Sequence, residues 1–242
     1  MSKTYKGDVT GNVVELNLLD ANESTLPNLG TPTVVTRNTG ANIVEQVVGD
    51  IPANWKQNDT SLKGLVIGTS CTSIGSYAFY SCTGLTGTLT IPDSVTSIGD
   101  YAFDDCSGLT GSLTIGNSVT SIGIQAFKSC NGFTGSLTIP NSVTTIGVHA
   151  FWACTGLTGS LVIPDSVTRI ETGAFRLCTS ITAVYTNTPA ASWVGTVALL
   201  ETNLVTTMYV NGVTALGYTA GAQTFQGKSL TIAEWTNYPN IP

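Results

Sequence analysis

Residues 89–109 read Leu-Thr-Ile-Pro-Asp-Ser-Val-Thr-Ser-Ile-Gly-Asp-Tyr-Ala-Phe-Asp-Asp-Cys-Ser-Gly-Leu, and closely similar stretches return every 24 positions. We call a set of equivalent positions in successive repeats a column. Two columns define the register: Ile67, Ile91, Ile115, Ile139 and Ile163, and Phe79, Phe103, Phe127, Phe151 and Phe175. A fixed period of about 20 to 50 residues is typical of a solenoid, because each unit buries its apolar face only by stacking on its neighbours. The sequence therefore predicts a stack of coils.

One repeat contains signals for two short strands and a turn. Residues 88–91 alternate Thr with Leu or Ile, which is the period of two of a strand with one buried face. Pro92 ends this strand because it removes a donor, and residues 95–98 form a second extended piece. Residues 100–106 are expected to form one helical turn that points its Ala, Phe and Cys side chains inward. The inward positions of this coil are Leu89, Ile91, Val95, Ile98, Ala102, Phe103, Cys106 and Leu109.

The repeats divide the chain into three predicted segments. Residues 62–185 form a solenoid of five repeats with parallel strands roughly 4.8 Å apart. Residues 1–61 are not repeats, and we expect a small β-rich domain used for attachment. Because the end of a solenoid exposes unpaired backbone, residues 186–242 are predicted to cap it, with a strand and a short helical piece at 207–220.

Composition and charge exclude several classes of partner. Charged residues are 10% of the chain, against about 25% in ordinary soluble domains, and the net charge is -6. Few cations, among them Lys128, Arg169 and Arg176, lie in the repeats, so the chain is not expected to bind nucleic acid. The chain contains no run of about 18 apolar residues, so membrane insertion is not predicted. The first residues lack the apolar core of a secretory signal, so we expect the chain to stay in the cytoplasm or to leave by another route.

The candidate reactive residues favour structural roles. Five of the six cysteines share one inward column, and Cys71 takes the place of a Val, so we predict buried free thiols. Zinc requires ligands that converge on one point, whereas this column runs along an axis, and we predict neither a metal nor a cofactor. His149 is the only histidine and is expected to face solvent, and the adjacent Asp104 and Asp105 point in different directions. We therefore predict that the protein is not an enzyme.

Two columns on the turn side change chemistry from coil to coil, although stacking requires nothing of them. They are Tyr80, Asp104, Lys128, Trp152 and Arg176, and Tyr77, Tyr101, Gln125, His149 and Gly173. Aromatic and Arg side chains anchor interfaces, which favours a recognition face here. The alternative is drift at unconstrained surface positions. The predicted binding residues are Tyr77, Tyr80, Tyr101, Asp104, Lys128, His149, Trp152 and Arg176.

Rows of hydroxyl side chains are expected on the outward side of successive strands. They comprise Thr88, Thr90, Ser112, Thr114, Ser136 and Thr138. Thr favours strands and makes an uncharged sheet soluble, which explains the rows without a ligand. The alternative is a flat grid that binds ice or a crystalline polysaccharide.

The repeat Leu-Thr-Ile-Pro-Asp-Ser-Val-Thr-Ser-Ile-Gly-x-x-Ala-Phe-x-x-Cys-x-Gly-Leu resembles the BspA-like leucine-rich repeat of bacterial and protist surface proteins. The resemblance covers residues 62–185 and implies a solenoid used for adhesion and for protein or glycan binding, without family catalytic residues. The departures are local. Gly68 and Gly116 replace the Pro, Glu171 replaces the Gly after Ile170, and changes at Ser180 and Ala183 suggest that the stack is ending.

A second resemblance concerns the start of the chain. Residues 7–20 resemble segments of bacteriophage tail-fibre and other virion proteins. This similarity implies a virion surface component, a fibre, tail or decoration protein, whose solenoid projects outward to bind a host surface or neighbouring virion proteins. A cellular BspA-like adhesin at a bacterial surface is the alternative, and a glycan depolymerase is a further one. An oligomer would form through residues 1–61 or by packing of the solenoids.

Overall fold

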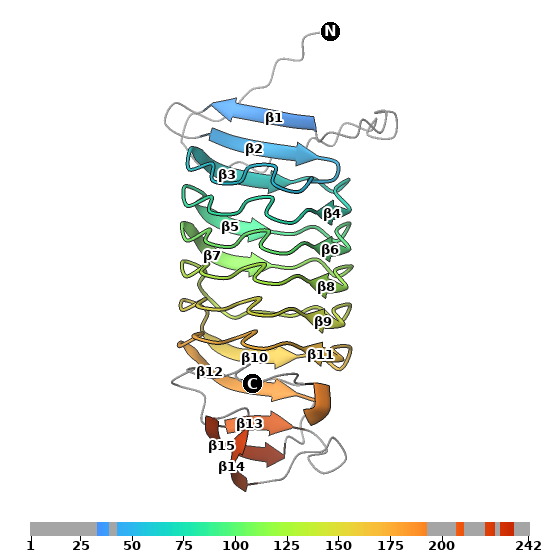
Figure 1. The fold of residues 1–242 in the computed structure, drawn as a ribbon, viewed down its shortest axis with the longest axis vertical. Coiled ribbons are helices and arrows are strands. Elements are labelled where there is room, and N and C mark those ends of the chain that lie inside the picture. Colours follow the sequence, from blue (N-terminus) through green and yellow to red (C-terminus); the bar gives the residue numbers. More distant parts are fainter. Residues whose placement is uncertain (1–32, 39–42, 193–206, 211–220, 226–227, 235–242) are drawn as a thin grey trace.

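The computed structural model describes residues 33–38, 43–192, 207–210, 221–225 and 228–234. These residues form a stack of coils whose strands run across the long axis of the molecule (Figure 1). We number coils 1 to 5 by their buried phenylalanines, Phe79, Phe103, Phe127, Phe151 and Phe175. The predicted solenoid with a period of 24 residues is confirmed by the register of its strands.

Two columns of parallel strands build the stack. The first contains the longer strands, β2 (Ile43–Val48), β3 (Leu62–Ile67), β5 (Gly87–Thr90), β7 (Leu109–Thr114), β10 (Gly159–Ile163), β12 (Ile181–Thr186), β13 (Thr207–Val210) and β15 (Lys228–Glu234). The second contains two-residue strands, β4 (Ser73–Ile74), β6 (Ser97–Ile98), β8 (Ser121–Ile122), β9 (Thr145–Ile146) and β11 (Arg169–Ile170). Pairs such as Leu89 with Leu113 and Ile98 with Ile122 are 24 residues apart, so equivalent residues lie on one another.

Parallel pairing continues beyond residues 62–185 on both sides. β2 pairs with β3, and β13 and β15 extend the sheet that contains β12. At each end the outermost strand is antiparallel: β1 (Thr33–Asn38) on β2, and β14 (Gly221–Phe225) on β15. A 3₁₀ turn, η2 (Ala190–Ser192), follows β12. The helical piece predicted near Tyr218 and most of the attachment segment lie outside the described residues, and the domain boundaries stay predictions.

The turn segment of each coil corrects one expectation. Residues 100–106 were expected to form a helical turn, but they form successive tight turns, with left-handed φ angles of 57° at Tyr101 and 60° at Asp105. The reason is that alternate N–H groups bond to the next coil: those of Tyr101 and Phe103 donate to the carbonyls of Ile124 and Ala126, 2.7 and 2.8 Å away. A helix would turn these donors back into its own coil.

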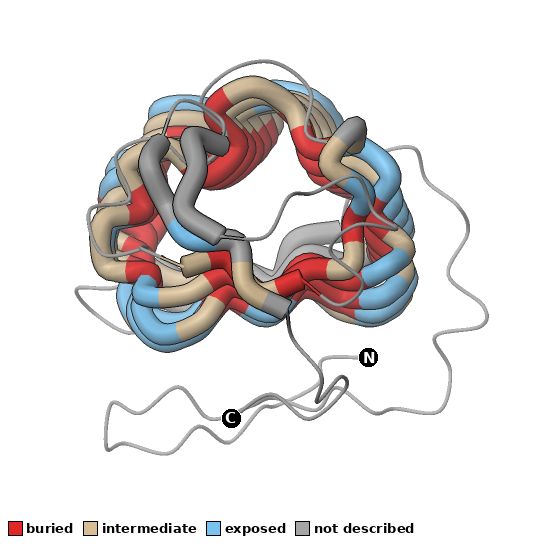
Figure 2. The backbone as a smooth tube through the Cα atoms, turned by 90° about the horizontal axis from the view of Figure 1, so that it is seen from below, coloured by how far each residue is buried: buried red, intermediate tan, exposed pale blue. Residues whose placement is uncertain are grey.

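The core is a set of apolar columns inside the stack. Figure 2, seen along the axis, shows buried residues lining the inside of the coils and exposed residues outside. The phenylalanine rings stack from coil to coil with centroids 5.0 to 5.5 Å apart. All six cysteines are buried free thiols, as predicted. The thiols of Cys106, Cys130 and Cys154 donate to carbonyl oxygens of the preceding coil at 3.0 Å, so the column also satisfies backbone acceptors.

Candidate functional site

The variable columns come together on one side of the stack. We call this side the turn face. It consists of residues 76–82, 100–106, 124–130, 148–154 and 172–178, whose turns hold their side chains at fixed positions in successive coils. Seven of the eight predicted binding residues are partly exposed there. Asp104 is the exception, because it is only 3% exposed and therefore does not offer a free carboxylate to a partner.

Three tyrosines form a cluster on coils 1 and 2. The rings of Tyr77 and Tyr101 stack with their centroids 4.5 Å apart and their planes 7° from parallel. The ring of Tyr80 packs on that of Tyr77, with the two centroids 5.7 Å apart. We call these three residues the tyrosine cluster. Because they contact one another, their rings are held in place before a partner arrives.

Lys128 links coils 2 and 4. Its Nζ lies 3.5 Å from Oδ2 of Asp104 in the coil before and 5.1 Å from the ring centroid of Trp152 in the coil after. Burial raises the pKa of the Asp104 carboxyl, and the Lys128 ammonium acts in the opposite direction. The buried carboxylate of Asp104 thus acts indirectly, because it holds the Lys128 ammonium against the indole of Trp152.

His149 lies beside Trp152, with ring centroids 5.2 Å apart. A Cβ at Gly173 would be 2.2 Å from Cδ2 of His149, so the imidazole lies over the glycine of the next coil. The pKa of His149 is lowered, first by burial and then by the charges of Arg176 and Lys128. Both cations therefore act on the same ring. We call Lys128, His149, Trp152 and Arg176 the cationic cluster.

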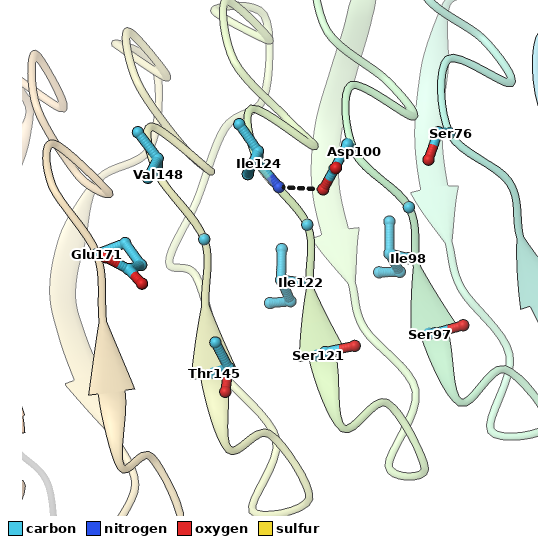
Figure 3. Close-up of a pocket in the computed structure, with 13 residues that line it drawn as sticks. Ser76, Ser97, Ile98, Asp100, Ser121, Ile122, Ile124, Thr145, Val148 and Glu171 are labelled. Carbon is cyan, nitrogen blue, oxygen red and sulfur yellow. Dashed lines mark hydrogen bonds between the residues drawn. The ribbon is translucent and has the colours of Figure 1, made fainter.

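A shallow groove of about 430 Å³ runs along the edge of the turn face across coils 1 to 5 (Figure 3). Its floor contains Gly123, where a Cβ would lie 2.6 Å from the backbone of Gly99, so the coils approach too closely there for a side chain. Oδ1 of Asp100 accepts a hydrogen bond from the N–H of Ile124 at 2.7 Å. This row was not among the predicted binding residues, although Asp100, Ile124 and Val148 also change from coil to coil and carry the same signal.

The reactive groups are not arranged for nucleophilic chemistry. Burial raises the pKa of the Cys178 thiol to about 12 and that of Cys71 to about 11, and a thiol is nucleophilic only as the thiolate. Within the described residues, no group of three or more His, Cys, Asp or Glu side chains could hold a metal ion. No helix in the described part of the chain is long and apolar enough to cross a membrane.

The hydroxyl rows have the predicted outward orientation, and all six of their residues are exposed. A second hydroxyl column, Thr96, Thr120, Thr144 and Thr168, serves the stack itself. Thr120 and Thr144 each donate from Oγ1 to the carbonyl of the preceding member at 3.1 Å. One Thr column is therefore explained by bonding between coils, whereas a function of the outer rows stays a prediction.

Comparison with known proteins agrees with this architecture. The profile described as BspA type leucine rich repeat region matches six copies over residues 50–182 and 109–231, which together exceed half of the 242 residues. A leucine rich cell surface protein of Faecalibacterium prausnitzii A2-165 has 24% identity and a TM-score of 0.54, covering 74% of this chain. This chain spans 55% of that one.

A leucine rich repeat protein of T. pallidum is 24% identical, with a TM-score of 0.49, over 76% of this chain and 85% of the other. No curated protein matches the chain.

Proposed function

The chain belongs to the BspA-type leucine-rich repeat family, and from this premise we propose that it is a non-enzymatic binding protein that recognises a partner with its turn face. The observation that carries the proposal is that the side chains that change between coils contact one another on this face. Tyr, Trp and Arg supply much of the binding energy at interfaces. Side chains that are already packed also lose less freedom on binding.

The chemistry of the site supports binding rather than catalysis. The thiols are buried, and the pKa values of Cys130 and Cys154 are raised by that burial. His149 packs on the indole of Trp152. Its surroundings are aromatic and cationic, which suits recognition of a ligand surface. The partner class that we propose is a protein or a glycan on a surface.

We further propose that the protein acts at a surface outside the cell. The support is the family and the F. prausnitzii relative, which is a cell surface protein by name. A bacterial cell and a virion are two carriers for such a solenoid. The virion hypothesis rests on residues 7–20, which lie outside the described residues. Capsid or tail genes beside this gene would favour the virion, whereas their absence would favour the cellular adhesin.

The turn face is tested by comparing two double variants on arrays of glycans and extracellular proteins. Tyr80→Ala with Trp152→Ala removes an aromatic ring from each half of the face. Thr90→Ala with Thr114→Ala changes the outer hydroxyl rows instead and serves as the matched control. We expect the first variant to lose the ligands that the wild type binds and the control to keep them, with both retaining the wild-type melting temperature within a few degrees. Equal binding by both variants would assign recognition to another surface.

A further inference from the structure

The cationic cluster concentrates positive charge in an acidic chain. The net charge of the chain is -6, yet Lys128 and Arg176 occupy one column two coils apart, with Trp152 between them. The lowered pKa of His149 has both cations among its causes, so their fields overlap at that ring. Lys and Arg side chains donate hydrogen bonds and cannot accept them. A ligand that meets this cluster must therefore offer acceptors, and an anionic group fits best.

Asp104 positions one of these charges without occupying the surface. Its carboxylate is buried under Lys128, and its Oδ2 is 3.5 Å from Nζ. The ammonium has three donors, and the side chain of Lys128 is 24% exposed, so donors remain for a ligand. The contact with the indole fixes the same ammonium from the other side. The cation is thus held beside a flat aromatic surface.

This combination identifies the chemical class of the ligand. An anionic group must lie next to an apolar ring face, and a sugar acid has both: a carboxylate or sulfate at its edge and a face of C–H groups that packs on indole. We propose that the cationic cluster binds an acidic polysaccharide, with separate anionic groups of the polymer on Lys128 and Arg176 and a sugar ring between them on Trp152. The inference rests on the proposed recognition role of the turn face and specifies its partner. The tyrosine cluster offers a second aromatic platform further along the same face.

The charge pattern of the face argues against more densely charged partners. Duplex DNA carries one charge per about 1.7 Å, and two formal cations cannot match that density. A run of Asp or Glu in a peptide would extend toward coil 2, where Asp100 and Asp105 are partly exposed on the same side. In an acidic polysaccharide, sugar rings separate the charges. Its rings can therefore lie on the aromatic side chains while its anionic groups meet only the cationic cluster.

The test measures binding of the whole chain to four immobilised polymers. Hyaluronate presents a carboxylate on every second sugar, chondroitin sulfate adds a sulfate to the sugar between, dextran is neutral, and poly-glutamate is an acidic peptide. We expect binding to one or both acidic polysaccharides, no binding to dextran, and weakening as salt is added. Lys128→Gln and Arg176→Gln should each weaken binding about tenfold, as expected for loss of one charge-assisted hydrogen bond.

Lys63→Gln is the matched control, because it removes a cation on β3 that lies away from the turn face. Its binding should equal that of the wild type, and circular dichroism should show all variants folded. A stronger response to poly-glutamate, equal binding to dextran, or a Lys63→Gln effect as large as the other two would overturn the inference.

The array experiment distinguishes failure of the acidic-polysaccharide inference from failure of the proposed recognition role of the turn face. If Tyr80→Ala with Trp152→Ala abolishes binding to another ligand while neither acidic polysaccharide binds, the acidic-glycan inference is wrong and the turn face remains the recognition surface. If the double variant changes nothing and neither acidic polysaccharide binds, both are wrong.

Discussion

Two neighbouring columns of the same solenoid differ in how much their side chains vary from coil to coil. The inner column contains Phe in all five coils, and neighbouring rings stack at 5.0 to 5.5 Å. One residue further along the chain, the outer column is Tyr80, Asp104, Lys128, Trp152 and Arg176. The backbone and the spacing of the coils are shared. The difference therefore comes from what surrounds each side chain.

Inside the stack, each ring must fill the space left by the ring before and after it, so any change in volume affects two neighbours. Outside, a side chain meets a neighbour on the adjacent coil and also meets solvent. Contacts such as that of Lys128 with Trp152 then form between unlike residues. Stacking therefore requires the same side-chain shape in the core of every coil, whereas it allows different side-chain types on the turn face.

The largest expected effect is loss of an inner ring. Phe127 is fully buried between Phe103 and Phe151, with Phe133 at its edge. Phe127→Ala should lower the free energy of unfolding by about 3–5 kcal/mol, because it removes buried area and leaves a cavity that the coils cannot close. Denaturant unfolding measures this change. Trp152→Ala is the comparison, and a loss as large at Trp152 would erase the distinction between the two columns.

The cysteine column should show a smaller effect. Cys130 is buried, and its thiol donates to the carbonyl of Phe103 at 3.0 Å. Cys130→Ala should cost about 2 kcal/mol, because burial of the sulfur and its hydrogen bond are both lost. Cys130→Ser keeps a donor and separates the two contributions. Thiol labelling of the folded wild type should be slow, and rapid labelling at the rate of an unfolded control would contradict the assigned burial.

Much of the fold could be predicted because the period assigns every residue of a repeat to a column. The core positions and the buried thiols follow directly from that register. The turn conformation could not be predicted, since the left-handed positions carry Tyr101 and Asp105 rather than Gly, the usual mark of such a φ. Stacking before coil 1 was also missed. Trp55 meets Phe79 edge-on at 5.6 Å, but its segment does not repeat the sequence pattern.

The site was predictable as a list of positions and not as a set of contacts. Variation between coils located the turn face, because residues in one column lie close together. The burial of Asp104 was missed, since a carboxylate next to a turn is usually exposed. It is buried here because Lys128 of the next coil covers it and Trp152 holds Lys128 in place. Such a dependence on three coils cannot be read from one repeat.

That dependence gives a third prediction. Asp104→Asn keeps the shape of the side chain and removes the charge that holds Lys128. We expect a change of less than about 1 kcal/mol in the free energy of unfolding, smaller than for either core change, because the burial that raises the pKa of Asp104 offsets the attraction between its charge and Lys128. Lys128→Met in the Asp104→Asn background should then have little further effect. Two independent, additive losses would show that these side chains do not act as a pair.

The smallest expected effect is a change in how the melting temperature depends on pH, and it arises from one residue on the turn face. Since the pKa of His149 in the folded chain is lowered, the unfolded chain binds more protons as pH falls below 6.5, the ordinary pKa of histidine, and acidification costs stability. His149→Gln, which places there the residue that Gln125 contributes to the same column, removes this cost. Between pH 7.5 and pH 5 the melting temperature of the variant should fall less than that of the wild type, while the two agree above pH 7.5.

Lys128 and Arg176 create part of the shift, so an anionic ligand bound to them should raise the pKa of His149 and reduce the difference. Parallel curves for the two proteins would mean that His149 does not feel the neighbouring cations, and that the turn face is less tightly coupled than the contacts between its coils imply.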